Sequence, residues 1–365
     1  PNPLPETERG NKTSIGGFLV TRSYVALLIL FAAIAIPLFH PGMQRSDAEP
    51  LVIDLPRGYV CYRAKAPIVI DGKLDDAAWA DAPWSEAFLD IEGTGKPKPR
   101  YLTRMKMLWD EKTLYIAAEL KEPHIWGTLK THDSVIFHDN DFEVFLDPDC
   151  DGHDYAELEL NALNTTWDLL LTKPYKDNGR AINAWEITGL KTGVHIDGTL
   201  NDPSDEDKCW TLEIAWPFQG LLEISTVKMP PKHGEQWRIN FSRVEWDTEI
   251  VKGKYVKIPK RPEHNWVWSP QGAIDMHRPD KWGILQFSTE APGTTKLLPD
   301  PAQPARDYLF GIYYAQRDYH KKHGRFLTPL SELKLPLGKE LIRPQLEVTT
   351  HGYEASVELL SLIHI

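Results

Sequence analysis

Cysteine is scarce in this sequence of 365 residues. The three cysteines, Cys61, Cys150 and Cys209, are odd in number and lie far apart. This spacing excludes a zinc site built on cysteine pairs and a framework of several disulfides. One disulfide remains open as an alternative, and the spacing does not indicate which two cysteines would form it.

Positive charge is also in short supply. Lysine and arginine together number 41 against 52 aspartates and glutamates, so the formal net charge is −11. A nucleic-acid partner would require a basic surface that displaces counterions, so we expect no binding to nucleic acid. The composition is otherwise that of an ordinary globular protein, and the length leaves room for two domains.

Long apolar runs are missing except for one segment, Tyr24–Phe39. At 16 residues it is short for a membrane span but matches the apolar region of a signal peptide. Lys12 and Arg22 precede it, and the small residues of Ser46–Ala48 suit cleavage. We therefore expect residues 1–48 to be a leader, with a signal peptide favoured over a membrane anchor. The protein would then be exported (periplasmic, secreted or on the cell surface), and any membrane association would be confined to this segment.

The stretch Phe137–Leu171 carries the clearest pattern in the chain. It predicts two strands, Asp141–Asp147 and Tyr155–Leu163, because apolar and polar residues alternate there with a period of two. In a hairpin of these strands, Glu143 would lie opposite Glu159. Two carboxylates directly across a ladder repel each other unless a cation, a basic side chain or a polar ligand lies between them. The alternative is a solvated outer face with a lysine nearby.

A second alternating segment is one candidate source of that balancing charge. Tyr101–Trp109 is predicted to be a strand with Arg104 and Lys106 on one face. If this strand neighbours the hairpin, these two cations would balance Glu143 and Glu159.

The loop between the two predicted strands of the hairpin is rich in carboxylates. Asp147, Asp149, Asp151 and Asp154 crowd one short turn that also contains a glycine. Carboxylates at alternate positions followed by glycine are typical of turns that direct several oxygens at calcium, so we predict a structural calcium site. A standard EF-hand is excluded, because Leu158 occupies its twelfth position and the flanks are strands. The alternative is turn chemistry alone.

The rest of the chain consists mainly of short alternating segments, with few helical patterns. This predicts a mainly β protein, an antiparallel β-sandwich of the immunoglobulin or jelly-roll type, over residues 49–289. A proline-rich linker is expected at residues 290–304, followed at residues 305–365 by a small, incomplete unit with a helix and a strand-like tail. Strands are expected at Tyr59–Arg63, Pro67–Ile70, Leu114–Leu120, Cys209–Trp216, Gln236–Trp246 and Lys281–Phe287, a long loop at Asp247–Asn265, the helix at Ala305–Gly324 and the tail at Gln345–Leu359.

Four stretches of sequence, in a fixed order along the chain, carry a family resemblance. They are IDGKLDDAAW at Ile70–Trp79, WDEKTLYIAAEL at Trp109–Leu120, the hairpin run at Asp141–Leu171, and NWVWSPQGAIDMHRPDKWGILQF at Asn265–Phe287. Over about Tyr59–Thr289 the chain resembles carbohydrate-binding module family 9, which is related to DOMON-like sandwiches. The resemblance implies a sandwich that binds the ends of plant polysaccharides between two tryptophans. A carboxylate, an arginine and an asparagine of the family bond to the sugar hydroxyls.

The resemblance also implies a set of ligand-binding residues. Glu143 matches the family's carboxylate and Asn161 its asparagine. The family's arginine position falls on Glu159, its first tryptophan on Phe137 and its second on or beside Met276. Phenylalanine supplies a flat ring for stacking on a sugar face, whereas methionine does not.

The last of the four stretches holds further candidates. Trp266 and Trp268 would supply a substitute ring for the missing tryptophan, with burial in the core as the alternative. Met276 and His277 are suitable axial ligands for haem, which some related electron-transfer sandwiches bind. A lone Met-His pair is weak support for haem, so electron transfer is kept only as an alternative function.

Catalytic motifs are missing from the sequence as well. It contains no serine elbow, glycine-rich phosphate loop or HExxH helix. Glu143, Glu157 and Glu159 are the carboxylates that a hydrolase of O-glycosyl bonds would use, at a separation of about 5–10 Å. A flat sheet face offers no environment that separates their pKa values. We therefore expect an exported, non-catalytic protein that binds a plant or algal polysaccharide, or its ends, in support of carbohydrate catabolism, with hydrolysis as the alternative.

Overall fold

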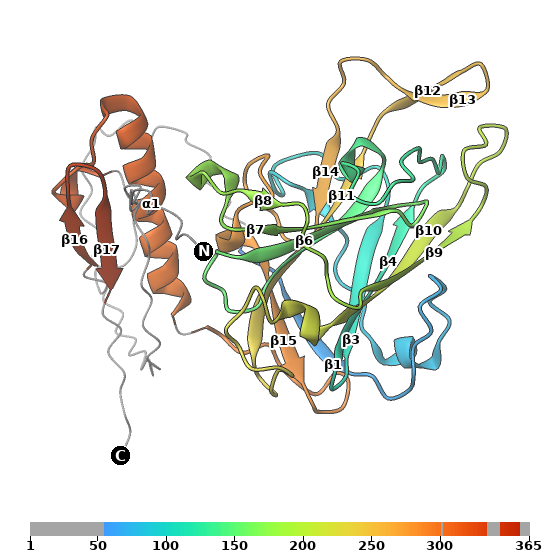
Figure 1. Cartoon of the computed structure of the whole chain (residues 1–365), viewed down its shortest axis with the longest axis horizontal. Helices are drawn as coiled ribbons and strands as arrows, with labels where there is room; N and C mark the ends of the chain where they lie inside the picture. Colours follow the sequence, from blue (N-terminus) through green and yellow to red (C-terminus); the bar gives the residue numbers. More distant parts are fainter. Residues whose placement is uncertain (1–54, 301, 334–343, 358–365) are drawn as a thin grey trace, which may run out of the picture. The chain divides into compact units, whose positions relative to one another are not determined.

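The computed structural model in Figure 1 describes residues 55–300, 302–333 and 344–357. The described residues fall into two compact units, divided between residues 298 and 299. The predicted leader, residues 1–48 with its apolar run, lies outside the described residues. In the part of the chain that is described, no helix is long and apolar enough to span a membrane.

The first unit is built on one large sheet of thirteen strands. Their order across the sheet is β8-β7-β6-β5-β11-β15-β1-β3-β4-β10-β9, with β14 beside β11 and β2 beside β14. Short 3-10 turns connect several of them: η1 (Ala77–Asp81), η2 (Ile136–His138), η3 (Tyr175–Asp177), η4 (Phe218–Leu221) and η5 (Pro279–Lys281). The strands are β1 (Gly58–Arg63), β2 (Leu89–Asp90), β3 (Thr103–Trp109), β4 (Thr113–Lys121), β5 (Asp141–Asp147), β6 (Tyr155–Asn161), β7 (Thr166–Leu171), β8 (Ala181–Ile182), β9 (Lys191–Asp197), β10 (Cys209–Pro217), β11 (Gln236–Glu245), β14 (His264–Val267) and β15 (Gly283–Ser288).

The sheet is mixed, which corrects the prediction of a purely antiparallel sandwich. Strand β1 lies between β15 and β3 and runs parallel to both, as the pairs Gly58 with Ile284 and Tyr62 with Leu108 show. The other pairings of the sheet are antiparallel. Alternation of apolar residues marks a strand but not its direction, so the sequence pattern could not reveal this insertion.

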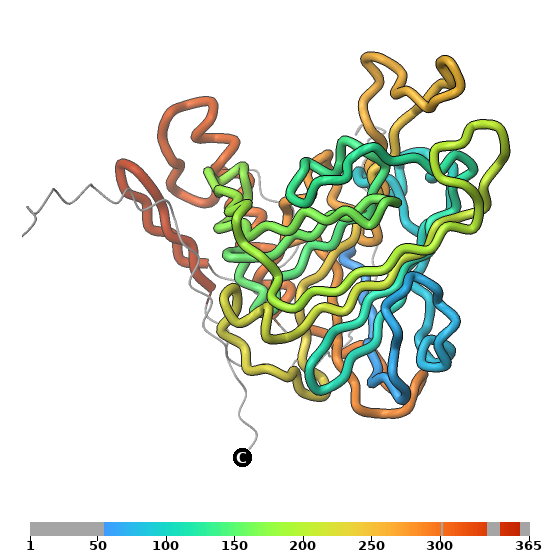
Figure 2. Tube along the Cα trace, turned by 45° about the vertical axis from the view of Figure 1, so that its right-hand side comes forward, coloured from blue at the N-terminus to red at the C-terminus, as the bar shows by residue number. Residues whose placement is uncertain are grey.

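The large sheet curls so that its two halves enclose one core (Figures 1 and 2). Buried side chains of β5, β6 and β11 on one half and of β3, β4 and β10 on the other belong to the same hydrophobic cluster. Aromatic rings fill much of it, and the rings of Trp237 and Phe287 lie 4.5 Å apart at their centroids. Most of the tryptophans therefore serve the interior; the fully buried ones are Trp79, Trp109, Trp210, Trp216, Trp237, Trp268 and Trp282.

The segment after β1 is held by one buried carboxylate of β10. Glu213 accepts hydrogen bonds from the backbone N–H of Asp71 and Gly72 and from the indole N–H of Trp79. Gly72 has φ of 84°, and a Cβ at this position would lie 2.4 Å from the backbone nitrogen of His195. Glu213 therefore fixes both the DG turn and the tryptophan of this segment to the sheet, and Thr211 and Lys106 add hydrogen bonds to the carbonyls of Gly72 and Trp79.

The predictions of a strand at Pro67–Ile70 and of a loop at Asp247–Asn265 are wrong. Residues 67–70 form no strand, and the N–H of Val69 bonds to the carboxylate of Asp76 instead of to a ladder. The predicted loop after β11 contains a separate hairpin of β12 (Thr248–Val251) and β13 (Lys254–Lys257), which projects beyond the large sheet (Figures 1 and 2). Its turn is Lys252-Gly253, whose φ values of 53° and 72° suit a tight hairpin turn.

The second unit contains α1 (Gln303–His323), η6 (Leu330–Glu332) and a hairpin of β16 (Pro344–Val348) and β17 (Tyr353–Val357). The predicted helix and its end are confirmed, because Gly324 adopts the left-handed conformation and donates its N–H to His320. The buried side chain of Gln316 exchanges two hydrogen bonds with the backbone of Leu327. A small apolar cluster between the helix and the hairpin completes this unit.

Candidate functional site

The hairpin of β5 and β6 has the predicted register. Glu143 lies directly opposite Glu159, and Glu157 follows on the same face, opposite Phe145. The other face contributes Phe142, Val144, Leu158 and similar apolar residues to the core. The period of two therefore separates a core face from an acidic face, as the sequence pattern indicated.

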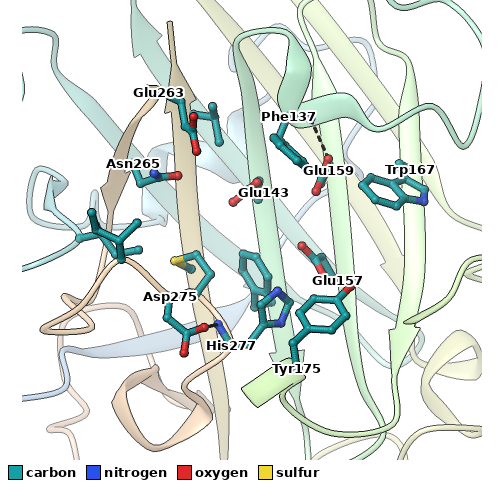
Figure 3. Close-up of a pocket in the computed structure, with 15 residues that line it drawn as sticks. Phe137, Glu143, Glu157, Glu159, Trp167, Tyr175, Glu263, Asn265, Asp275 and His277 are labelled. Atoms are coloured by element: carbon teal, nitrogen blue, oxygen red, sulfur yellow. Dashed lines mark hydrogen bonds between the residues drawn. The ribbon is translucent and has the colours of Figure 1, made fainter. Parts of the chain in front are cut away.

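A pocket of about 310 Å³ opens on this acidic face of the sheet (Figure 3). It lies over β5, β6 and β7, and residues from β11, η2, η3 and β14, from the segment 274–277, and Ile91 and Glu263 complete it. Its carboxylates are Glu143, Glu157, Glu159, Glu263 and Asp275. Its rings belong to Phe137, Phe145, Trp167, Tyr175 and His277.

Aromatic side chains surround the carboxylates of the pocket. In Figure 3 the three glutamates of the hairpin lie at the centre, with Phe137 above them, Trp167 to the right, and Tyr175 and His277 below. The backbone N–H of Phe137 donates to Glu159 at 2.9 Å, which fixes η2 against β6. Tyr175 is 47% exposed, so its ring remains available to a ligand.

The central carboxylates are almost completely buried. Glu143, Glu157 and Glu159 are 5%, 5% and 2% exposed, and Asp141, beside them on the same face, is fully buried. Burial raises the pKa of Glu143 to about 7. Burial, reinforced by the charge of Glu143, raises the pKa of the other three well above the ordinary carboxyl value. At neutral pH these carboxyl groups therefore favour protonation or a bound partner that compensates their charge.

The predicted balancing cations do not reach this face. Strand β3 is separated from β5 by three other strands, so Arg104 bonds to Glu119 at 2.6 and 2.9 Å, and Lys106 donates to the carbonyl of Trp79. That prediction is wrong because sequence alternation does not specify which strands are neighbours. Among the residues described, no lysine or arginine forms an ion pair with Glu143 or Glu159.

Three of these acids are close enough to share a cation. Asp141, Glu143 and Glu159 each place one oxygen within 4.8 Å of the others. Such a site would offer only carboxylate oxygens, the ligands that calcium prefers.

Asn161 lies outside the pocket and is fully buried. Its amide nitrogen donates to the carbonyl of Leu129 and to Asp139, and its oxygen accepts the N–H groups of Leu163 and Thr165. The side chain thus ends β6, two residues before the predicted end of the strand, and holds the preceding loop in place. Its polar atoms are engaged within the protein.

Trp266 and Trp268 are buried beside the pocket and do not line it. Trp268 is fully buried, with its ring 5.9 Å from that of Phe241. Trp266 is 4% exposed and stacks on His264 at 5.8 Å, next to Tyr101. Both rings therefore serve packing in this structure.

Met276 and His277 do line the pocket. Met276 is 8% exposed and packs in an apolar cluster with Trp282, whose indole N–H donates to the carbonyl of Met276. His277 Nδ1 lies 2.8 Å from the hydroxyl of Tyr155. Burial lowers the pKa of His277 to about 4, so this imidazole is neutral near pH 7.

The acidic loop between β5 and β6 brings Asp147, Asp149 and Asp151 together, with oxygens within 4.8 Å of one another, but not Asp154. The two oxygens of Asp147 accept the N–H groups of Cys150 and Gly152 at 2.9 Å, which is a turn role independent of any cation. Burial raises the pKa of Asp147 to about 8. Both alternatives, calcium ligand and turn residue, remain compatible with this geometry.

All three cysteines lie in the described part of the chain, and no disulfide joins them.

The sequence pattern missed several residues of the pocket. Trp167 belongs to β7, the third strand of the same meander, which follows β6 after the turn at Asn164. The alternation of Trp167, Leu169 and Leu171 was the available signal for that strand. Tyr175, Glu263 and Asp275 come from connecting segments, where no periodic signal exists, and Asn265 comes from the short strand β14, where a loop was predicted.

Comparison with known proteins gives a family for this unit. The family described as "Carbohydrate family 9 binding domain-like" matches residues 70–253, half of the chain. No curated protein sequence matches the chain. Two solved structures of a carbohydrate binding module family 9 (CBM9) from Caldicellulosiruptor kristjanssonii are similar, one in complex with cellotriose and one with glucose. The cellotriose complex is 16% identical to this chain and covers 66% of it, and the glucose complex is 17% identical and covers 65%. Both structures are matched over their whole length, and each superposes on this chain with a TM-score of 0.41. On the family match, the chain belongs to the carbohydrate family 9 binding domain-like proteins.

Proposed function

We propose that this protein binds a saccharide in the pocket above β5, β6 and β7 and does not cleave it. The observation that carries the proposal is the convergence of rings and carboxylates in one pocket of a family 9 domain. Phe137, Trp167 and Tyr175 offer flat apolar faces to the C–H groups of a sugar ring. Glu143 and Glu157 offer oxygens that accept hydrogen bonds from hydroxyl groups.

The charge of the pocket narrows the class of saccharide. Five acidic side chains line it together with a histidine that is neutral near pH 7, and no lysine or arginine is among its described lining residues, so the pocket offers no positive charge to a uronate or a sulfated sugar. A neutral plant or algal polysaccharide, presented by its chain end, suits a pocket of about 310 Å³. Export of the protein and a role in carbohydrate catabolism complete the proposal and rest on the predicted leader and on the family.

Binding is favoured over hydrolysis by the electrostatics of the three glutamates. A glycoside hydrolase needs one carboxyl that stays protonated and one that stays ionised. Burial raises the pKa of Glu143, Glu157 and Glu159 in the same direction, so the surroundings stabilise the ionised form of none of the three.

A glycan array that contains neutral, sulfated and uronate-bearing polysaccharides would test the proposal, followed by titration calorimetry with the strongest neutral ligand. Replacing Glu143 by Gln should weaken binding by about 1–3 kcal/mol, the usual effect of a lost charged acceptor. Trp167→Ala should weaken it by more than about 1 kcal/mol through loss of a stacking ring.

The matched control is Trp84→Ala, because Trp84 is another half-buried tryptophan but does not line the pocket. Binding should be unchanged in this variant. Affinities that are equal in Glu143→Gln, Trp167→Ala and the parent protein would place the saccharide site elsewhere. Release of reducing sugar by the parent protein, abolished in Glu143→Gln, would replace binding with hydrolysis as its function.

A further inference from the structure

A second group of titratable side chains lies where a loop meets strand β7. His132 and Asp133 belong to the loop before η2, Asp168 to β7, and Glu186 to the segment before β9. Nε2 of His132 and one oxygen each of Asp168 and Glu186 lie within 4.8 Å of one another. These four described residues do not line the saccharide pocket.

The imidazole of His132 is oriented by its other nitrogen. Nδ1 lies 3.0 Å from the carbonyl oxygen of Thr166, which can only accept a hydrogen bond, so Nδ1 carries a hydrogen. In the neutral tautomer with its hydrogen on Nδ1, the lone pair of Nε2 faces the carboxylates. A histidine that donates one ring N–H to a backbone carbonyl and presents its other nitrogen to carboxylates has the arrangement of a metal ligand.

The carboxylates surround Nε2 at the spacing that a small cation requires. Oxygens of Glu186, Asp133 and Asp168 lie 3.1, 3.4 and 3.7 Å from Nε2. Ligands held about 2.0–2.1 Å from a tetrahedral Zn²⁺ are about 3.3–3.4 Å from one another. The three distances from Nε2 therefore bracket the edge of such a tetrahedron, and His132, Asp168 and Glu186 also have ligand atoms within 4.8 Å of one another.

Asp168 supplies an independent sign that a ligand belongs at this place. Its side chain is buried, at 1% exposure, and its Oδ2 accepts the N–H of Ile187 at 2.6 Å. Its Oδ1 has no hydrogen-bond partner in the described part of the chain and faces Nε2 of His132. A buried carboxylate oxygen without a donor is destabilising unless a cation satisfies it.

We propose that His132, Asp168 and Glu186 bind one divalent cation of the zinc type. Imidazole nitrogen combined with carboxylate oxygen suits Zn²⁺ and related first-row ions, whereas Ca²⁺ and Mg²⁺ favour oxygen alone. The cation fastens the loop that carries His132 to strand β7. The competing arrangement is an imidazolium paired with the same carboxylates, which binds no metal.

The test uses the full chain after treatment with a chelator and desalting. Titration calorimetry with ZnCl₂ should show one equivalent bound, and CaCl₂ and MgCl₂ in excess should not displace it. The melting temperature should rise with Zn²⁺, because a cation bound only by the folded state stabilises it. His132→Ala and Glu186→Gln should each weaken Zn²⁺ binding by more than about 10-fold, the smallest loss usual even for outer partners of a metal.

Two features of the chain keep the result interpretable. Glu186 is 60% exposed, so Glu186→Gln should fold like the parent protein and its metal-free melting temperature checks this. His153→Ala is the matched control, because His153 has the same 46% exposure as His132 but faces the single carboxylate Asp151 at 4.0 Å. Absence of Zn²⁺ binding by the parent protein, or equal binding by the parent and His132→Ala, would leave the imidazolium pair as the correct description.

Discussion

Glu143 gives the sharpest test of the electrostatics of the pocket. Burial raises its pKa from the ordinary value of 4.5 to about 7, so the folded state binds this proton more tightly than the unfolded chain does. The stabilisation from this group is therefore fully present below about pH 4.5 and is lost as the pH rises through about 7.

The magnitude follows from the distance between the two pKa values. The difference between 4.5 and about 7 corresponds to about 3 kcal/mol of unfolding free energy, at about 1.4 kcal/mol per pH unit. Glutamine has the shape of the protonated acid and does not ionise. Glu143→Gln should therefore match the parent protein at about pH 5 and exceed its stability by up to about 3 kcal/mol at about pH 8.

Urea unfolding followed by tryptophan fluorescence at about pH 5 and about pH 8 would measure this difference. Glu119→Gln is the control of opposite sign. Burial opposes ionisation of Glu119, but hydrogen bonds from Lys121 and Arg104 outweigh it and lower its pKa. This variant should therefore lose stability at the higher pH. A Glu143→Gln variant whose stability changes with pH as steeply as that of the parent would refute the reasoning.

Two further predictions concern cofactors. Calcium should raise the melting temperature at about pH 8 or above, where Asp147 ionises, and Asp147→Asn should remove this rise. Identical melting temperatures with calcium and with chelator would show that the acidic loop is a turn only. Protein purified with haem available should show no Soret band, because Met276 packs against Trp282 and His277 is hydrogen-bonded to Tyr155. A Soret band that Met276→Ala abolishes would restore the electron-transfer alternative.

The strands of the large sheet could be predicted because each has one buried face. The alternation in β5 and β6 and the short loop between them fix the register, so the pairing of Glu143 with Glu159 followed from the sequence alone. The parallel insertion of β1 could not be predicted in this way. Its neighbours β3 and β15 are far apart in the sequence, and periodicity contains no information on direction or order.

Only those pocket residues that the hairpin pattern or the family resemblance indicated could be predicted from the sequence. Phe137, Glu143 and Glu159 line it, as expected from their positions around β5 and β6. The sequence pattern did not distinguish a tryptophan that lines the pocket from one that is buried in the core. Trp167 lines the pocket and Trp268 is fully buried, yet each lies in or beside a strand among apolar residues. Exposure of a large ring depends on the segments that pack over it, and a local pattern does not contain those segments.

Buried carboxylates elsewhere in the same unit show what is unusual about the pocket. Glu213 accepts three hydrogen bonds from two backbone N–H groups and an indole, Asp139 accepts the N–H groups of two residues and a hydroxyl, and Glu119 is paired with basic side chains. By contrast, no backbone N–H or basic side chain donates to Glu143 or Glu157 within the described residues. The described part of the fold thus supplies backbone or basic donors to its structural carboxylates, and to Glu159 and Asp275 of the pocket, but supplies none of either kind to Glu143 and Glu157. Since the carboxylates of Glu143 and Glu157 receive no backbone or basic donor from the residues described, donors from outside the protein have most to contribute here, and the hydroxyl groups of a saccharide are donors of the required kind.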